Sequence, residues 1–138
     1  MSPGSRRTRR ITLTEVCGYM GKAEQFLEAT QTEHDAGRYG PATSLAVHAA
    51  INAADVVSGL RSAQRSTSAN HDQTLGLLRE AGRDGRAVAT QLQRLLPLKN
   101  RAEYDPQPVA RTQATAALRA AQQAVGIACP ALADRDTT

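Results

Sequence analysis

The segment that decides the fold is residues 41–60, PATSLAVHAAINAADVVSGL, in which six of the twenty residues are alanine. Alanine has the highest helix propensity, and the alanines recur here at three-to-four spacing beside larger apolar residues. Small side chains on one helix face let a neighbouring helix approach closely. We therefore expect a helix over residues 41–60 that packs tightly and antiparallel against the helix before it.

The preceding segment has the pattern of a capped helix. Thr12 and Glu15 have the spacing of a capping box, and apolar residues follow at helical intervals from Val16 onward. Gly37 supplies the left-handed residue that commonly ends a helix, and Pro41 suits a first helical turn. These signals predict a first helix from residue 12 to about residue 36.

The segments that follow also favour helices. Residues 62–70 contain four Ser or Thr and no strongly apolar residue, which indicates a loop. A short helix is expected from residue 70 or 71 to Gly82, and a fourth helix, capped by Asp84, is expected to kink at Pro97. A last helix should end at Pro130 and bury Val109, Thr112, Ala116, Ala120, Ala124 and Ile127. No segment has a strand pattern, so the prediction is an all-α, four- to five-helix up-and-down bundle.

Composition limits the function further. The chain has 138 residues, which suits one domain, and no apolar run approaches the length that spans a bilayer. With three Tyr, one Phe and no Trp, it lacks the material for a base-stacking platform such as an RRM or OB module. Two cysteines make no metal site, and we expect reduced thiols, no cofactor, no membrane association and a cytoplasmic location.

Charge is concentrated at the N-terminus. Four arginines lie within the first ten residues, and they account for the whole formal excess of +4. We expect residues 1–11 to form a disordered basic tail, residues 12–128 a neutral helical domain, and residues 129–138 a C-terminal tail. The tail could bind phosphate without sequence specificity.

Four motifs in this order resemble the HEPN domain family: AGRY at residues 36–39, NAAD at 52–55, HD at 71–72 and LKNRAEYDP at 98–106. The resemblance covers roughly residues 12–128. It implies a bundle of four or five helices that dimerises and handles RNA or nucleotides, often in a toxin–antitoxin or defence system. Catalytic members of the family are metal-independent ribonucleases, in which an Arg and a His with four to six residues between them act together at the dimer interface.

The catalytic motif is degenerate at the expected place. With four to six residues between Lys99 and the expected His, that His should lie at one of residues 104–106, which are Tyr-Asp-Pro. Tyrosine, with an ordinary pKa near 10, is a poor base at neutral pH. A formal match remains at Arg65 and His71, but it lies in the expected loop before the third helix, where capping or packing is the competing role.

These residues are compatible with two function classes. The first is a noncatalytic, homodimeric HEPN-like module that binds RNA, a nucleotide or a partner protein encoded by a neighbouring gene. Its ligand-binding residues would be Lys99, Arg101, Glu103 and Tyr104. The last three could alternatively form a structural network that caps the fourth helix and fastens it to the first. The second class is an active ribonuclease toxin that uses Arg65 and His71. Asp55 has the pattern of an ordinary helix-face charge.

Overall fold

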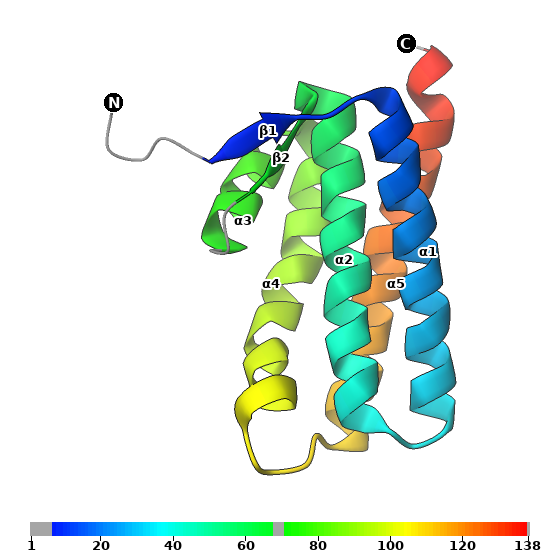
Figure 1. The fold of residues 1–138 in the computed structure, drawn as a ribbon, viewed down its shortest axis with the longest axis vertical. Coiled ribbons are helices and arrows are strands. Elements are labelled where there is room, and N and C mark those ends of the chain that lie inside the picture. The colour runs from blue at the N-terminus through cyan, green and yellow to red at the C-terminus, as the bar shows by residue number, and fades with distance from the viewer. Residues whose placement is uncertain (1–6, 68–70, 138) are drawn as a thin grey trace.

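The computed structural model describes residues 7–67 and 71–137. Four long helices, α1 (Leu13–Asp35), α2 (Tyr39–Ser62), α4 (Gly82–Tyr104) and α5 (Arg111–Ala133), form an up-and-down bundle (Figure 1). The short helix α3 (His71–Arg79) lies beside one end of α4, and a 3-10 helix, η1 (Asp134–Thr137), follows α5. The predicted all-α bundle is confirmed, and among the described residues no helix is long and apolar enough to cross a bilayer.

The predicted ends of α1 have the expected geometry. The Glu15 backbone N–H donates to Thr12 Oγ1 at 3.1 Å, and the Thr12 N–H donates to Glu15 Oε1 at 3.1 Å, which completes the capping box. Gly37 has φ +77°, a left-handed conformation that glycine adopts without steric cost. The chain therefore turns sharply between α1 and α2, and the two helices pack antiparallel.

The alanine-rich helix α2 lies at the centre of the bundle. It contacts α1, α4 and α5, and its six alanines are completely buried: Ala42, Ala46, Ala49, Ala50, Ala53 and Ala54. A helix that has neighbours on three sides cannot carry large side chains on all of them at close interaxial distance. The composition of residues 41–60 thus determines the packing of the whole bundle.

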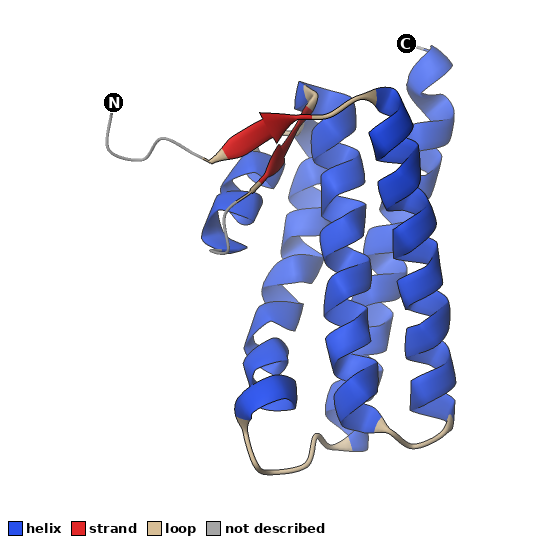
Figure 2. Ribbon diagram, viewed as in Figure 1, coloured by secondary structure: helices blue, strands red, loops and turns tan. Residues whose placement is uncertain are grey.

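A small antiparallel sheet corrects two of the expectations. Strand β1 (Thr8–Arg10) pairs with strand β2 (Gln64–Ser66), so part of the expected basic tail and part of the expected 62–70 loop are ordered (Figure 2). Ile11, which follows β1, is 6% exposed, and its N–H donates to Ala63 O at 2.9 Å. The tail expectation for residues 1–6, and the loop expectation for residues 68–70, lie outside the described residues.

Pro130 does not end α5 as the sequence predicted, whereas Pro97 lies inside α4, where the sequence predicted a kink. Helix α4 continues through Pro97 to Tyr104, and α5 continues through Pro130 to Ala133, so the expected C-terminal tail begins in helix. Both prolines are exposed, which places the ring on the solvent side of the helix. Asp84 is not the cap of α4, because Ala81 occupies that position and Asp84 lies in the first turn.

Candidate functional site

A buried ion pair joins α2 to β2. Asp55, in the C-terminal half of α2, is 3% exposed. Its Oδ2 accepts from Arg65 Nε at 3.2 Å and lies 3.1 Å from Arg65 Nη2. Nothing in the sequence distinguishes Asp55 from other helix-face charges, because its burial depends on β2 covering it. Arg65, one of the two predicted catalytic residues, is thereby held against a carboxylate.

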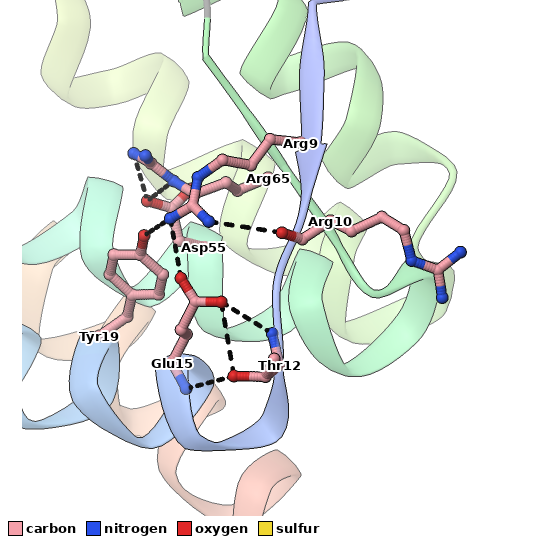
Figure 3. A network of polar contacts seen from close by, with 7 residues as sticks. All are labelled: Arg9, Arg10, Thr12, Glu15, Tyr19, Asp55 and Arg65. Atoms are coloured by element: carbon pink, nitrogen blue, oxygen red, sulfur yellow. Dashed lines mark hydrogen bonds and ion pairs between the residues drawn. The ribbon is translucent and has the colours of Figure 1, made fainter.

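The ion pair belongs to a larger network that links both strands to the bundle (Figure 3). The Arg65 guanidinium lies 5.1 Å from the centre of the Tyr19 ring, and the Tyr19 hydroxyl accepts from Arg9 Nη2 at 3.0 Å. Arg9 Nη2 also lies 2.9 Å from Glu15 Oε2. Arginines from β1 and β2 are thus fixed by acidic and aromatic side chains of α1 and α2. This network fastens the sheet to one end of the bundle.

Electrostatics in this network follow from burial and charge. Burial raises the pKa of Asp55 to about 6, although the nearby Arg65 and Arg9 act to lower it. At Glu15 the opposite holds: the hydrogen bond from the Thr12 backbone and then the Arg9 guanidinium lower the pKa of the carboxyl. The two acids thus have pKa values shifted in opposite directions.

His71 has different electrostatic neighbours from Arg65. It is the first residue of α3 and is partly buried. Burial, and then the charge of Lys99, lower the pKa of His71, while Glu103 and Asp72 raise it. The charged side chains that act on His71 therefore include Lys99 and Glu103 of α4. Arg65, in contrast, is bonded to Asp55.

The predicted ligand-binding residues of α4 divide into two groups. Lys99 Nζ lies 3.1 Å from Glu103 Oε2 and 5.8 Å from the centre of the Tyr104 ring, which is 74% exposed. Arg101 follows Lys99 by two residues and therefore projects about 200° away around the helix axis. The Glu103 ion pair lies within α4, so it does not provide the expected fastening to α1.

Arg101 belongs instead to a row of arginines that we call the α4 basic face. It consists of four exposed residues: Arg83, Arg86, Arg94 and Arg101. Their spacing places them within one arc of about 80°, and the row is about 27 Å long at the rise of an α-helix. The two acids of α4, Asp84 and Glu103, project outside this arc. The α4 basic face thus carries four guanidinium groups and no carboxylate.

Charge is segregated across the whole bundle. Helix α1 contains five acids and one Lys, α4 contains five basic residues and two acids, and α5 contains two Arg and no acid. In Figure 1, α1 and α4 lie on opposite sides of the bundle. The prediction of a neutral body therefore describes the total charge of the helical domain and misses how that charge is distributed. Counting the charged residues of each expected helix would have revealed the distribution.

Other titratable side chains have local roles. His34 Nε2 lies 2.8 Å from Thr115 Oγ1, and the His48 ring stacks on Phe26 with the ring centres 5.3 Å apart. Cys17 and Cys129 are free, exposed thiols. Across residues 7–67 and 71–137, no group of three His, Cys, Asp or Glu side chains is placed to hold a metal ion.

Comparison with known proteins found no family model that matches the chain and no curated protein with significant similarity. The candidate functional site is therefore defined by its geometry alone.

Proposed function

We propose that this protein is a noncatalytic, HEPN-like module that binds RNA through the α4 basic face. The observation that carries the proposal is the row of four exposed arginines without an intervening carboxylate. Each guanidinium presents a planar fork of donors that matches a phosphate group. A row about 27 Å long can contact several successive phosphates of one strand.

The charges of the neighbouring helices also favour a positive potential at α4. Helix α5, which packs against α4, has two exposed arginines, Arg111 and Arg119, and no acid. The acidic helix α1 lies on the other side of the bundle, so its negative potential does not cancel the positive potential at α4. With few aromatic side chains available for stacking, this surface would bind mainly the phosphate backbone and discriminate weakly between sequences.

An active ribonuclease is the second candidate, and one observation favours it. The lowered pKa of His71 leaves more of the imidazole neutral at pH 7, the form that accepts a proton, and Lys99 acts on it electrostatically. The Arg65 guanidinium, however, is engaged by Asp55 and the Tyr19 ring. Binding without cleavage is therefore the function that we propose.

The salt dependence of RNA binding tests the proposal. A labelled single-stranded RNA of mixed sequence is titrated by fluorescence anisotropy between about 50 and about 200 mM salt. Four phosphate contacts predict a slope of log K against log salt of about −3. The double variant Arg86→Gln/Arg94→Gln should bring the slope to about −1.4, because two contacts are lost.

A matched control removes the same charge elsewhere. The double variant Lys22→Gln/Arg38→Gln also loses two positive charges, in α1 and at the turn after it. It should keep the wild-type slope. Equal slopes in both double variants would contradict the proposal, because the arginines of α4 would then have no special role.

A cleavage assay separates the two candidate functions. The same RNA, incubated with the protein and EDTA and analysed on a gel, should stay intact. Cleavage that is abolished by Arg65→Ala and by His71→Ala would establish the ribonuclease instead.

A further inference from the structure

A cavity of about 460 Å³ lies at one end of the bundle. It is formed where the C-terminal turns of α2 and α5 meet the first turn of α4, and Leu60, Ile127 and Pro130 supply apolar walls. Arg61 and Asp84 supply polar groups to the same cavity, and Asp134 and Arg135 of η1 add two more charged residues to its lining. Its volume falls within the range of about 300–1,000 Å³ that is typical of small-molecule sites. The cavity thus combines apolar walls with a few polar groups, as such sites commonly do.

Two of these charged side chains, Arg61 and Asp84, form a donor and acceptor pair. Arg61 Nη2 donates to Asp84 Oδ2 at 3.3 Å, and the two side chains are 52% and 32% exposed. This bond uses one nitrogen and one oxygen, whereas a guanidinium carries five N–H donors and a carboxylate accepts at two oxygens. A ligand with adjacent donors and acceptors on one flat edge could therefore bind both side chains.

Guanine has this arrangement among the RNA bases. Its Watson–Crick edge carries the O6 acceptor, which an arginine can bind, beside the N1–H and N2–H₂ donors, which a carboxylate can bind. The other three bases do not present two adjacent donors to a carboxylate. The apolar walls would cover the faces of the base, and the Arg61–Asp84 pair would bind its edge.

The cavity and the α4 basic face meet at the first turn of α4. Asp84 lines the cavity, and the preceding residue, Arg83, begins the row, with its side chain about 100° from that of Asp84 around the helix axis. We propose that this cavity binds a guanine base of an RNA strand whose phosphates lie along the α4 basic face. The inference rests on the proposed function and adds to it a single position of base preference.

Gly126 provides a way to close the cavity. It lines the cavity within α5, and a Cβ at this position would meet no atom within 4 Å. Gly21 of α1 has equally open surroundings and does not line the cavity. Gly126→Leu and Gly21→Leu therefore form a matched pair, since both replace a helical glycine by a good helix former.

The experiment compares two RNAs of equal charge. One is a uridine dodecamer, and the other carries a single central guanosine. Wild type should bind the guanosine oligomer roughly tenfold more tightly, which is the discrimination expected of a bidentate contact. Asp84→Asn and Gly126→Leu should bind both oligomers equally, and Gly21→Leu should keep the preference. Circular dichroism of each variant verifies that it is folded.

Each outcome bears on one proposal or the other. Equal affinity of wild type for the two oligomers, with the expected salt slope, would overturn the guanine site and leave the RNA proposal standing. If neither oligomer binds, the RNA proposal fails. The cavity is then tested alone by titrating guanosine monophosphate, with uridine monophosphate as control, into ¹⁵N-labelled protein. Shifts confined to residues around Ile127 with the guanine nucleotide would retain the base site, and their absence would overturn it.

Discussion

The burial of Asp55 is unfavourable for its carboxylate and also positions the small sheet on the bundle. Removing a carboxylate from water raises its pKa, and the Arg65 and Arg9 charges offset only part of that effect. In return, Asp55, the one acidic residue of the alanine-rich helix α2, gives β2 a charged anchor on the bundle. We infer that the ion pair specifies where the sheet docks on the bundle, at some expense in stability at neutral pH.

The pH dependence of stability tests this role of Asp55. In the folded protein the carboxyl keeps its proton to about pH 6, whereas an unfolded Asp loses it near its ordinary pKa of 3.8. Between these values the folded state binds more protons, so the contribution of this group to the free energy of unfolding falls as pH rises. When the pH rises from about 4.5 to about 7, the free energy of unfolding of Asp55→Asn should fall by about 2 kcal/mol less than that of wild type.

Urea denaturation of both proteins at the two pH values measures the difference. Other groups that titrate in this range are common to both proteins, so they cancel in the comparison. Identical pH dependence in wild type and Asp55→Asn would mean that the pKa of Asp55 is not raised by folding.

At the scale of elements, helix α2 sets the spacing of the bundle. Ala49 and Ala53 are completely buried and lie where α2 meets its neighbours. Ala49→Leu or Ala53→Leu should lower the free energy of unfolding by about 1–3 kcal/mol, because the added atoms force helices apart or side chains off their preferred rotamers. Ala116→Leu, at an exposed position of α5, is the matched control and should be nearly neutral. Thermal melts that agree among the three variants would place the tight packing elsewhere.

Local signals in the sequence predicted these elements well where a few neighbouring residues decide the structure. The capping box at Thr12 and the left-handed Gly37 are of this kind. Which face of α5 is buried was less predictable: Thr112 and Ala116, expected to be buried, are exposed. Where alanine fills most positions of a helix, hydrophobic periodicity no longer distinguishes its faces.

Features that depend on distant parts of the chain could not be predicted. Strands of three residues carry no usable alternation, and β1 and β2 form because residues more than fifty positions apart pair with each other. The burial of Asp55 follows from that pairing. Among the predicted ligand-binding residues of α4, Lys99 and Glu103 do lie together, but the helix geometry places Arg101 on a different face.

For the whole molecule, the separation of charge limits how copies can associate. Bringing the α4 basic faces of two copies together would place like charges opposite each other, and so would joining two α1 faces. A symmetric homodimer must therefore use a surface where charges are already paired. The end of α4, residues 97–104, has this property on one side, because Lys99 is paired with Glu103 and lies near the Tyr104 ring.

We propose a homodimer through that end of α4, in which the exposed Tyr104 of each copy becomes buried. A core with one Phe and no Trp buries modest area per helix, so a second copy would add stabilising contacts. Sedimentation equilibrium at micromolar concentration should give twice 14.7 kDa. Tyr104→Ala should raise the dissociation constant roughly thirtyfold, as expected when a central aromatic contact of about 2 kcal/mol is removed. Leu13→Ala alters another exposed large apolar residue, which is 50% exposed in α1, and should leave the dimer intact. A monomeric wild type would exclude the dimer, and dissociation by Leu13→Ala alone would place the interface on α1.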